Sequence, residues 1–154
     1  MKIKMLVMDV DGTLTDGCIY ISPTGEAFKA FNVKDGYAIA HILPTVGAIP
    51  VIITGRKSDI VSLRCKELGI THCYQGVSDK LSVLKELALE IGAVSEQIAY
   101  IGDDINDLDC IRFCGFTACP SDAADEVKKV VDYVCKNQGG KGAVREFIEH
   151  IERF

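Results

Sequence analysis

The chain opens with the segment that decides its fold: residues 5–13 read MLVMDVDGT, four apolar residues followed by two aspartates with one valine between them. A short apolar run that ends in polar residues is typical of a strand buried on both faces of a parallel sheet. Side chains two positions apart on a strand point to the same side. Asp9 and Asp11 are therefore expected to lie together at the carboxyl end of this strand.

Similar apolar runs follow along the chain and alternate with segments of helical periodicity. The predicted strands are residues 5–8, 49–54, 72–74, 98–101, 116–118 and 133–134. The predicted helices are residues 36–46, 59–68, 80–91, 106–113, 123–130 and 143–154. This alternation predicts an α/β fold, a doubly wound parallel sheet with helices on both faces.

One segment departs from the alternation. Residues 18–21 and 27–32 both have strand patterns, and Ser22-Pro23-Thr24-Gly25 between them carries turn residues. These features predict a β-hairpin inserted after the first strand. Its apolar strand and open edge favour oligomerisation. With no linker, repeat or shift in composition, residues 1–154 are expected to form a single domain.

The composition excludes several classes of protein. The chain has 154 residues, of which 48% are hydrophobic and 25% charged, with a formal net charge of −5. These are ordinary globular values, and the negative charge argues against nucleic acid as a partner. No apolar stretch approaches the roughly 18 residues that a membrane span needs, so no membrane association is expected.

The cysteines indicate the compartment. There are seven, without a CxxC pair. An odd set of this kind predicts a reducing, cytoplasmic location rather than a disulfide framework or a zinc site. Met1 is expected to begin the mature protein, because Asp9 and Asp11 interrupt the apolar stretch that a secretory signal would need.

Polar residues follow most of the predicted strands, at the edge where parallel sheets bind ligands. Asp103, Asp104 and Asp107 follow the strand 98–101 and would join Asp9 and Asp11. Such an all-oxygen cluster suits Mg²⁺. Thr54 and Lys80 add a hydroxyl and a cation, which are groups that hold phosphate oxygens. Together they predict phosphoryl transfer through an aspartyl-phosphate intermediate.

This arrangement resembles the haloacid dehalogenase superfamily of phosphatases. Its four motifs stand in order as residues 9–13 (DVDGT), Thr54, Lys80 and residues 102–107 (GDDIND). The resemblance implies that Asp9 is the nucleophile and Asp11 the general acid and base. It also implies that Asp9, the backbone carbonyl of Asp11, and Asp103 hold Mg²⁺. Thr54 and Lys80 would bind the transferring group, and Asp104 and Asp107 would orient waters or Lys80.

A closer resemblance extends over the whole chain. The segments 15–17, 31–37, 53–56, 69–72, 74–76 and 139–146 are similar to the 3-deoxy-D-manno-octulosonate 8-phosphate phosphatase family. That family includes relatives that act on nonulosonate 9-phosphates of the sialic acid type. The resemblance implies a fold without a cap domain and a homotetramer formed through the hairpin, in which a neighbouring subunit closes the site.

The same resemblance implies a substrate and its contacts. The substrate would be a 2-keto-3-deoxy sugar-acid phosphate, used in making precursors of cell-surface glycans such as lipopolysaccharide. The implied contacts are Asn32, Val33, Lys34, Asp35, Gly36, Arg56, Arg64 and Lys80. Arginine suits a 2-keto acid because it grips a carboxylate with two hydrogen bonds. Lys34 and Ala40 stand where the family pattern has arginine.

Other functions remain open at this stage. The enzymatic alternatives are a nonulosonate 9-phosphate phosphatase and a broad-specificity sugar phosphatase of the same fold. A signalling receiver domain combines similar residues, but its phosphorylated aspartate ends the third strand, where this chain has only Tyr74-Gln75-Gly76. The non-enzymatic alternative is an inactive assembly domain, against which the intact Asp9, Asp11, Lys80 and Asp103 argue.

Overall fold

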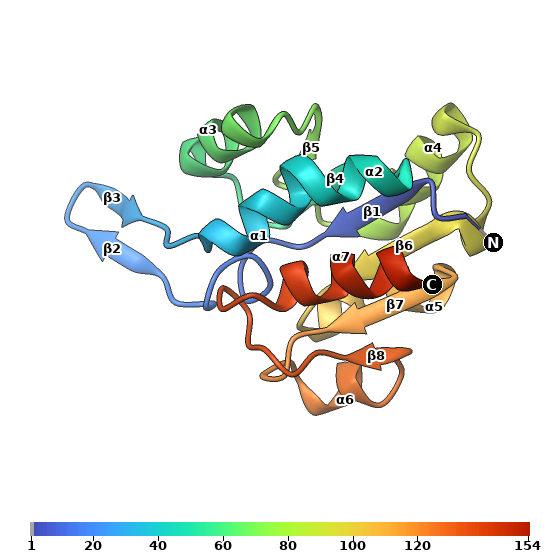
Figure 1. The fold of residues 1–154 in the computed structure, drawn as a ribbon. Coiled ribbons are helices and arrows are strands. Elements are labelled where there is room, and N and C mark those ends of the chain that lie inside the picture. Colours follow the sequence, from blue (N-terminus) through green and yellow to red (C-terminus); the bar gives the residue numbers. More distant parts are fainter. Residues whose placement is uncertain (1) are drawn as a thin grey trace.

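Six parallel strands form the central sheet of the computed structural model, which describes residues 2–154 (Figure 1). Their order is β5-β4-β1-β6-β7-β8, which confirms the predicted doubly wound topology. The strands are β1 (Met5–Met8), β4 (Ile49–Ile53), β5 (His72–Tyr74), β6 (Ile98–Ile101), β7 (Phe116–Cys119) and β8 (Tyr133–Val134). β1 and β6 lie at the centre, and every one of their residues is buried.

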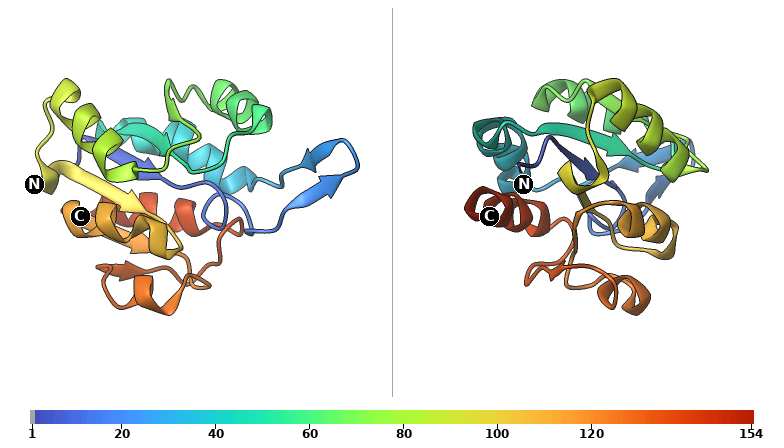
Figure 2. Two further views of the ribbon diagram at one scale, coloured as in Figure 1. Left: turned by 180° about the vertical axis from the view of Figure 1, so that it is seen from behind. Right: turned by 90° about the vertical axis from the view of Figure 1, so that its right-hand side faces the viewer.

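A hydrophobic core lies on each face of the sheet, because alternate side chains of one strand point to opposite sides. Leu6 and Met8 of β1 pack in one core, and Met5 and Val7 pack in the other. The first core is covered by α2 (Leu43–Val46), α3 (Asp59–Leu68) and α7 (Ala143–Arg153), while α1 (Val33–Tyr37) contacts α7 at its edge. The second is covered by α4 (Lys80–Ile91), α5 (Leu108–Phe113) and α6 (Asp125–Lys128) (Figure 2).

The predicted helix over residues 36–46 differs from the observed structure. It starts earlier, at Val33, because the Asn32 side chain accepts hydrogen bonds from the backbone N–H groups of Lys34 and Asp35 and so caps α1. A π-helical turn, Ala38–Ile42, then separates α1 from α2. The widened turn lies just before Pro44, whose ring does not fit a regular helix interior.

Two later helices are shorter than predicted. The segment expected to start at Asn106 begins as a 3₁₀ turn, Ile105–Asp107, and becomes α-helical only at Leu108. The helix expected over residues 123–130 is reduced to α6. In the part of the chain that the structure describes, no helix has the length and apolar character needed to cross a bilayer.

The hairpin is confirmed, with different bounds. Antiparallel β2 (Tyr20–Ser22) and β3 (Gly25–Phe28) extend away from the body of the molecule (Figures 1 and 2). The return strand ends at Phe28 rather than continuing to residue 32, because Phe28 pairs with Tyr20, the first residue of β2. Among residues 2–154, no cap domain accompanies this hairpin.

Candidate active site

The polar residues predicted at the strand ends meet at one edge of the sheet. Asp9 and Asp11 follow β1, Thr54 follows β4, and Asp103 follows β6. They line an open pocket of about 180 Å³ together with Gly55, Arg56, Asp104 and Asn106. The parallel register aligns Met8 with both Ile52 and Ile101, which brings these strand ends to the same level. The structure therefore brings these predicted residues together.

Asp9 lies at the floor of this pocket. Its backbone N–H donates to the carbonyl of Ile101, which ties the residue to the end of β6. Its Oδ1 atom accepts a hydrogen bond from Lys80 Nζ at 3.0 Å. Burial and the charge of Asp107 together raise the pKa of Asp9, although Lys80 opposes the shift. The carboxylate is thus held against a lysine at the first position of α4.

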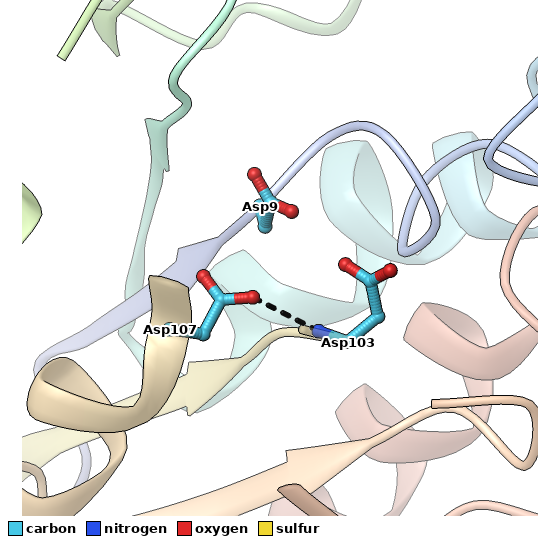
Figure 3. Close-up of side chains that lie close together, drawn as sticks. All are labelled: Asp9, Asp103 and Asp107. Carbon is cyan, nitrogen blue, oxygen red and sulfur yellow. Dashed lines mark hydrogen bonds between the residues drawn. The ribbon is translucent and has the colours of Figure 1, made fainter. Parts of the chain in front are cut away.

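Asp107 organises the base of the site and is completely buried. Its Oδ1 atom accepts hydrogen bonds from Lys80 Nζ at 2.9 Å and from the Tyr100 hydroxyl at 2.6 Å. Its Oδ2 atom accepts from the backbone N–H group of Asp103 (Figure 3) and from that of Asp104. Asp107 therefore fixes both the lysine and the loop that carries Asp103.

Lys80 lies between two buried carboxylates. Burial lowers the pKa of Lys80, but the charges of Asp9 and Asp107 outweigh it and raise the pKa overall. Lys80 is therefore positively charged at neutral pH.

Three carboxylates point towards a shared space: Asp9, Asp103 and Asp107 each offer an oxygen within 4.8 Å of the others (Figure 3). Both oxygens of Asp107 already accept hydrogen bonds, so Asp9 and Asp103 are the carboxylates that could bind a metal ion in this space. Asp103 accepts a hydrogen bond from the Thr13 hydroxyl but forms no ion pair within residues 2–154. Burial and the charge of Asp9 raise the pKa of Asp103 to about 8. Two facing carboxylates, of which only Asp9 has a cationic partner, fit a hard divalent cation.

Glycines allow the loop after β1 to approach its neighbours closely. Gly12 has a φ of +87°, and a Cβ atom there would lie 2.0 Å from Asp103 Oδ2. Gly139 and Gly140 pack beneath the same loop, where the Gly140 N–H donates to the carbonyl of Thr13 at 3.1 Å. A Cβ atom on Gly139 would lie 1.9 Å from the carbonyl oxygen of Gly12. The backbone around Asp11 is therefore enclosed from both sides.

Asp11 has a partner that the sequence did not reveal. Its Oδ1 atom lies 2.6 Å from Lys29 Nζ, and its Oδ2 atom lies 4.0 Å from Arg56 Nε. Lys29 also pairs with Glu26 of the hairpin at 3.0 Å. Burial lowers the pKa of Lys29, but the hydrogen bonds to Asp11 and Glu26 outweigh it and raise the pKa. The only signal in the sequence was a pair of opposite charges three residues apart, which is too common to be informative.

Several predicted substrate-binding residues lie elsewhere in this chain. Asn32 and Gly36 line a separate, mainly apolar pocket together with Asp35 and Arg64. The Asn32 side chain caps α1, and Arg64 lies over the Phe31 ring and pairs with Glu67. Val33 and Lys34 are exposed. Of the predicted substrate contacts, only Arg56 and the Lys80 ammonium lie at the Asp9 pocket, so the others stay predictions.

Two acidic side chains near these sites have local roles. Asp35 is buried, and its Oδ1 atom accepts the backbone N–H of Arg145 in the first turn of α7. Asp104 caps the 3₁₀ turn and forms no hydrogen bond with Lys80, whereas Asp107 does. Of the two aspartates predicted to orient Lys80, Asp107 is therefore the one that binds it, and Asp104 lies at the edge of the pocket.

Comparison with known proteins shows the family of this chain. Residues 57–148 match the model of the haloacid dehalogenase-like hydrolase family, and the chain belongs to that family. It is 45% identical to 3-deoxy-D-manno-octulosonate 8-phosphate phosphatase of Escherichia coli K12 over 145 residues, which are 94% of this chain and 77% of the relative. It is 43% identical to the Yersinia pestis enzyme of the same name over 150 residues, 97% of this chain and 80% of the relative.

Solved structures show the same similarity. The Moraxella catarrhalis octulosonate 8-phosphate phosphatase, crystallised with magnesium, phosphate and the octulosonate product KDO, superimposes with a TM-score of 0.94. It is 43% identical, and the match covers 99% of this chain and 87% of that one. The cobalt-bound Haemophilus influenzae enzyme also has a TM-score of 0.94, with 38% identity and coverage of 99% and 88%.

Proposed function

We propose that this chain is a Mg²⁺-dependent phosphomonoesterase that hydrolyses 3-deoxy-D-manno-octulosonate 8-phosphate to the sugar acid and phosphate. The observation that carries the proposal is the placement of Lys80 Nζ between Asp9 and Asp107, beside the unpaired Asp103 carboxylate. A nucleophile, a fixed cation and two carboxylates able to hold a divalent cation are the parts that phosphoryl transfer needs. The substrate rests on the similarity to the octulosonate phosphatases.

The first chemical step uses Asp9 and Asp11. A carboxylate oxygen of Asp9 attacks phosphorus, the bond from phosphorus to the sugar oxygen breaks, and Asp11 donates a proton to that oxygen. In the second step Asp11 takes a proton from water, the water oxygen bonds to phosphorus, and the Asp9 carboxylate leaves. Asp9 and Asp11 are therefore restored after each turnover.

The other residues bind and compensate charge. Lys80 and the Thr54 hydroxyl would hold the non-bridging oxygens of the transferring group. Mg²⁺ would be held by the carboxylates of Asp9 and Asp103 and the backbone carbonyl of Asp11, and when bound it would offset the phosphate's negative charge. Asp107 would keep Lys80 aimed at Asp9, and Asp104 would orient water at the edge of the pocket.

Substrate selection would require more than one subunit. The hairpin exposes large apolar side chains, with Ile21 75% and Phe28 53% exposed, a surface that association would cover. We propose a homotetramer in which a neighbouring subunit closes the pocket and completes the contacts made by Asn32, Val33, Lys34, Asp35, Gly36, Arg56, Arg64 and Lys80. Light scattering at micromolar concentration tests this assembly, and a monomer would contradict it.

The decisive assay is phosphate release with Mg²⁺ from octulosonate 8-phosphate, sialic acid 9-phosphate, its deaminated analogue and simple sugar phosphates. Asp9→Asn serves as the blank, since it keeps the side-chain size and removes the nucleophile. A preference for octulosonate 8-phosphate of at least about 100-fold in kcat/KM, about 3 kcal/mol of discrimination, would support the proposal. Indiscriminate release would leave a broad-specificity phosphatase, and no release would favour an assembly role.

A nonulosonate 9-phosphate is the second candidate substrate. Its support is that Lys34 and Ala40 depart from the arginines that the resemblance to the octulosonate enzymes leads us to expect, which weakens the eight-carbon assignment. Lysine keeps the charge without the guanidinium fork, and alanine loses both. Preference for a nine-carbon substrate in the same assay would select this alternative.

The proposed location is the cytoplasm. Its support is the set of seven cysteines without a CxxC pair, which is typical of reducing compartments.

A further inference from the structure

The Lys29 side chain connects the hairpin to the residue proposed as general acid and base. It is only 3% exposed, although its backbone lies at the edge of the molecule, just after β3. Its ammonium lies 2.6 Å from Asp11 Oδ1 and 3.0 Å from Glu26 Oε2. A lysine ammonium held by two carboxylates has a defined orientation, because moving it would break both ion pairs at once.

Glu26 is itself fixed from the other side. Its Oε1 atom accepts a hydrogen bond from the Ser58 hydroxyl, and Ser58 is the residue before α3. The Ser58 backbone N–H donates to Gln75 Oε1 at 2.8 Å, after β5. The Glu26 carboxylate that holds Lys29 is therefore itself tied, through Ser58, to the start of α3 and to the segment after β5.

This anchoring decides how the Asp11 carboxylate is presented. Oδ1 is occupied by Lys29, so Oδ2 is the oxygen on the side of Arg56 and the pocket. The Asp11 side chain is 20% exposed, and without Lys29 it would be free to rotate away from the pocket. Misplacing a catalytic group by about 1 Å can cost about 100-fold in rate.

We propose that Lys29 is a positioning residue: held by Glu26, it fixes the Asp11 carboxylate so that one oxygen faces the leaving group. This inference rests on the proposed phosphatase function, in which Asp11 donates the proton to the departing oxygen. The hairpin would then contribute to catalysis, because its Glu26 holds Lys29 in place.

The test compares two leaving groups in the full-length enzyme with Mg²⁺. A sugar alkoxide needs a proton to depart, whereas p-nitrophenolate is stable without one. The parameter is kcat/KM, since it reports the steps up to formation of the aspartyl phosphate and excludes its hydrolysis. The variants are Lys29→Met, which keeps the length and removes the charge, and Lys29→Arg, which keeps the charge. Lys129→Met is the control, because Lys129 is exposed and outside the site.

The expected result is a dependence on the leaving group. Lys29→Met should lower kcat/KM for octulosonate 8-phosphate and for a simple alkyl phosphate by about tenfold or more, and that for p-nitrophenyl phosphate by less than about threefold. Lys29→Arg should recover most of the alkyl activity. Equal losses with both kinds of substrate, or no loss with either, would overturn the proposal.

Two further measurements keep the outcomes separate. If Lys29→Met does not fold, Glu26→Gln replaces it, because this change weakens the contact with Lys29 without removing it. It should give a smaller loss in kcat/KM, again larger for alkyl than for aryl phosphates. If the unaltered enzyme hydrolyses the alkyl and aryl phosphates but not octulosonate 8-phosphate, the proposed substrate is wrong, and the same comparison still decides the role of Lys29. If it hydrolyses none of them, the proposed phosphatase function is wrong, and the proposed role of Lys29 is wrong as well.

Discussion

Tyr100 and Asp107 are joined by a 2.6 Å hydrogen bond inside the core, in which the phenol donates to the carboxylate oxygen that also faces Lys80. Tyr100 has no exposed surface, and burial followed by the charge of Asp107 raises its pKa well above the ordinary value. The phenol therefore stays protonated and serves as a permanent donor. A buried residue of β6 thus supports the cation of the active site.

Replacing Tyr100 with phenylalanine should loosen that support. Asp107 would lose one donor, and we expect a loss of about 2 kcal/mol in the free energy of unfolding, the usual range for a hydrogen bond to a charged acceptor. Activity should fall several-fold because Lys80 is held less firmly. Urea denaturation and kcat measure the two effects. Tyr74→Phe is the control, since its hydroxyl makes only a 3.4 Å contact with His72; an equal loss in both variants would contradict this role for Tyr100.

Metal binding should depend on pH. The pKa of Asp103 is raised to about 8, so the metal-free folded chain holds a proton that the unfolded chain releases. Its stability should consequently fall as the pH rises from about 4 to about 8. Because Mg²⁺ must displace this proton, its affinity should drop by up to about tenfold per unit below pH 8. Calorimetric titration at pH 6 and pH 8 measures this, and equal affinity at both would contradict it.

Gly12→Ala should disrupt the metal site more than an ordinary strained glycine does. The added Cβ atom would overlap Asp103 Oδ2, and the backbone has a φ of +87°. Gly25→Ala is the matched control, because it has a φ of +124° with nothing within 4 Å of the new Cβ atom. Both variants should lose about 1 kcal/mol or more of stability from strain. Only Gly12→Ala should lose the rise in unfolding temperature that Mg²⁺ causes. If Gly12→Ala keeps this rise, the proposed Mg²⁺ site at Asp9 and Asp103 is wrong.

A second pH effect should come from Asp35. Burial raises the pKa of Asp35 to about 6, although the N–H groups at the start of α7 oppose the shift. Its Oδ2 atom is buried without a partner. The folded state binds the proton more tightly than the unfolded state, so the contribution to stability should fall between about pH 4 and pH 6, by at most about 3 kcal/mol.

Asp35→Asn isolates this effect from that of Asp103. The amide oxygen still accepts the Arg145 N–H but does not titrate in this range. The stability difference between variant and parent should therefore shift in favour of the variant as the pH rises from 4 to 6.5. Urea denaturation at the two values measures it, and a difference independent of pH would contradict the role assigned to burial.

The parts of the site that the sequence predicted are those that depend on parallel strands alone. Asp9, Thr54 and Asp103 each follow a strand directly, and strands in register bring their ends together whatever the helices do. The link between Asp107 and Lys80 was expected only from the resemblance to the haloacid dehalogenase motifs, which left open whether Asp104 or Asp107 orients Lys80 or water.

Other features depend on how elements pack, and local sequence does not specify that. The pairing of Lys29 with Asp11 depends on the angle at which the hairpin leaves the body, and the role of Asp35 depends on α7, which lies more than a hundred residues further along the chain. The early start of α1 could have been predicted from Asn32, which is a favourable capping residue.

The contact between Gly140 and Thr13 has a consequence for synthesis of the chain on the ribosome. Asp9 precedes Gly140 by more than a hundred residues, yet the loop that follows Asp9 is held from below by Gly139 and Gly140. The central strand must also wait for β6 before both its edges are paired. A nascent chain therefore carries Asp9 in an incomplete site until Gly139 and Gly140 have been made, and we expect a chain truncated before Gly139 to lack phosphatase activity even if its first strands have formed.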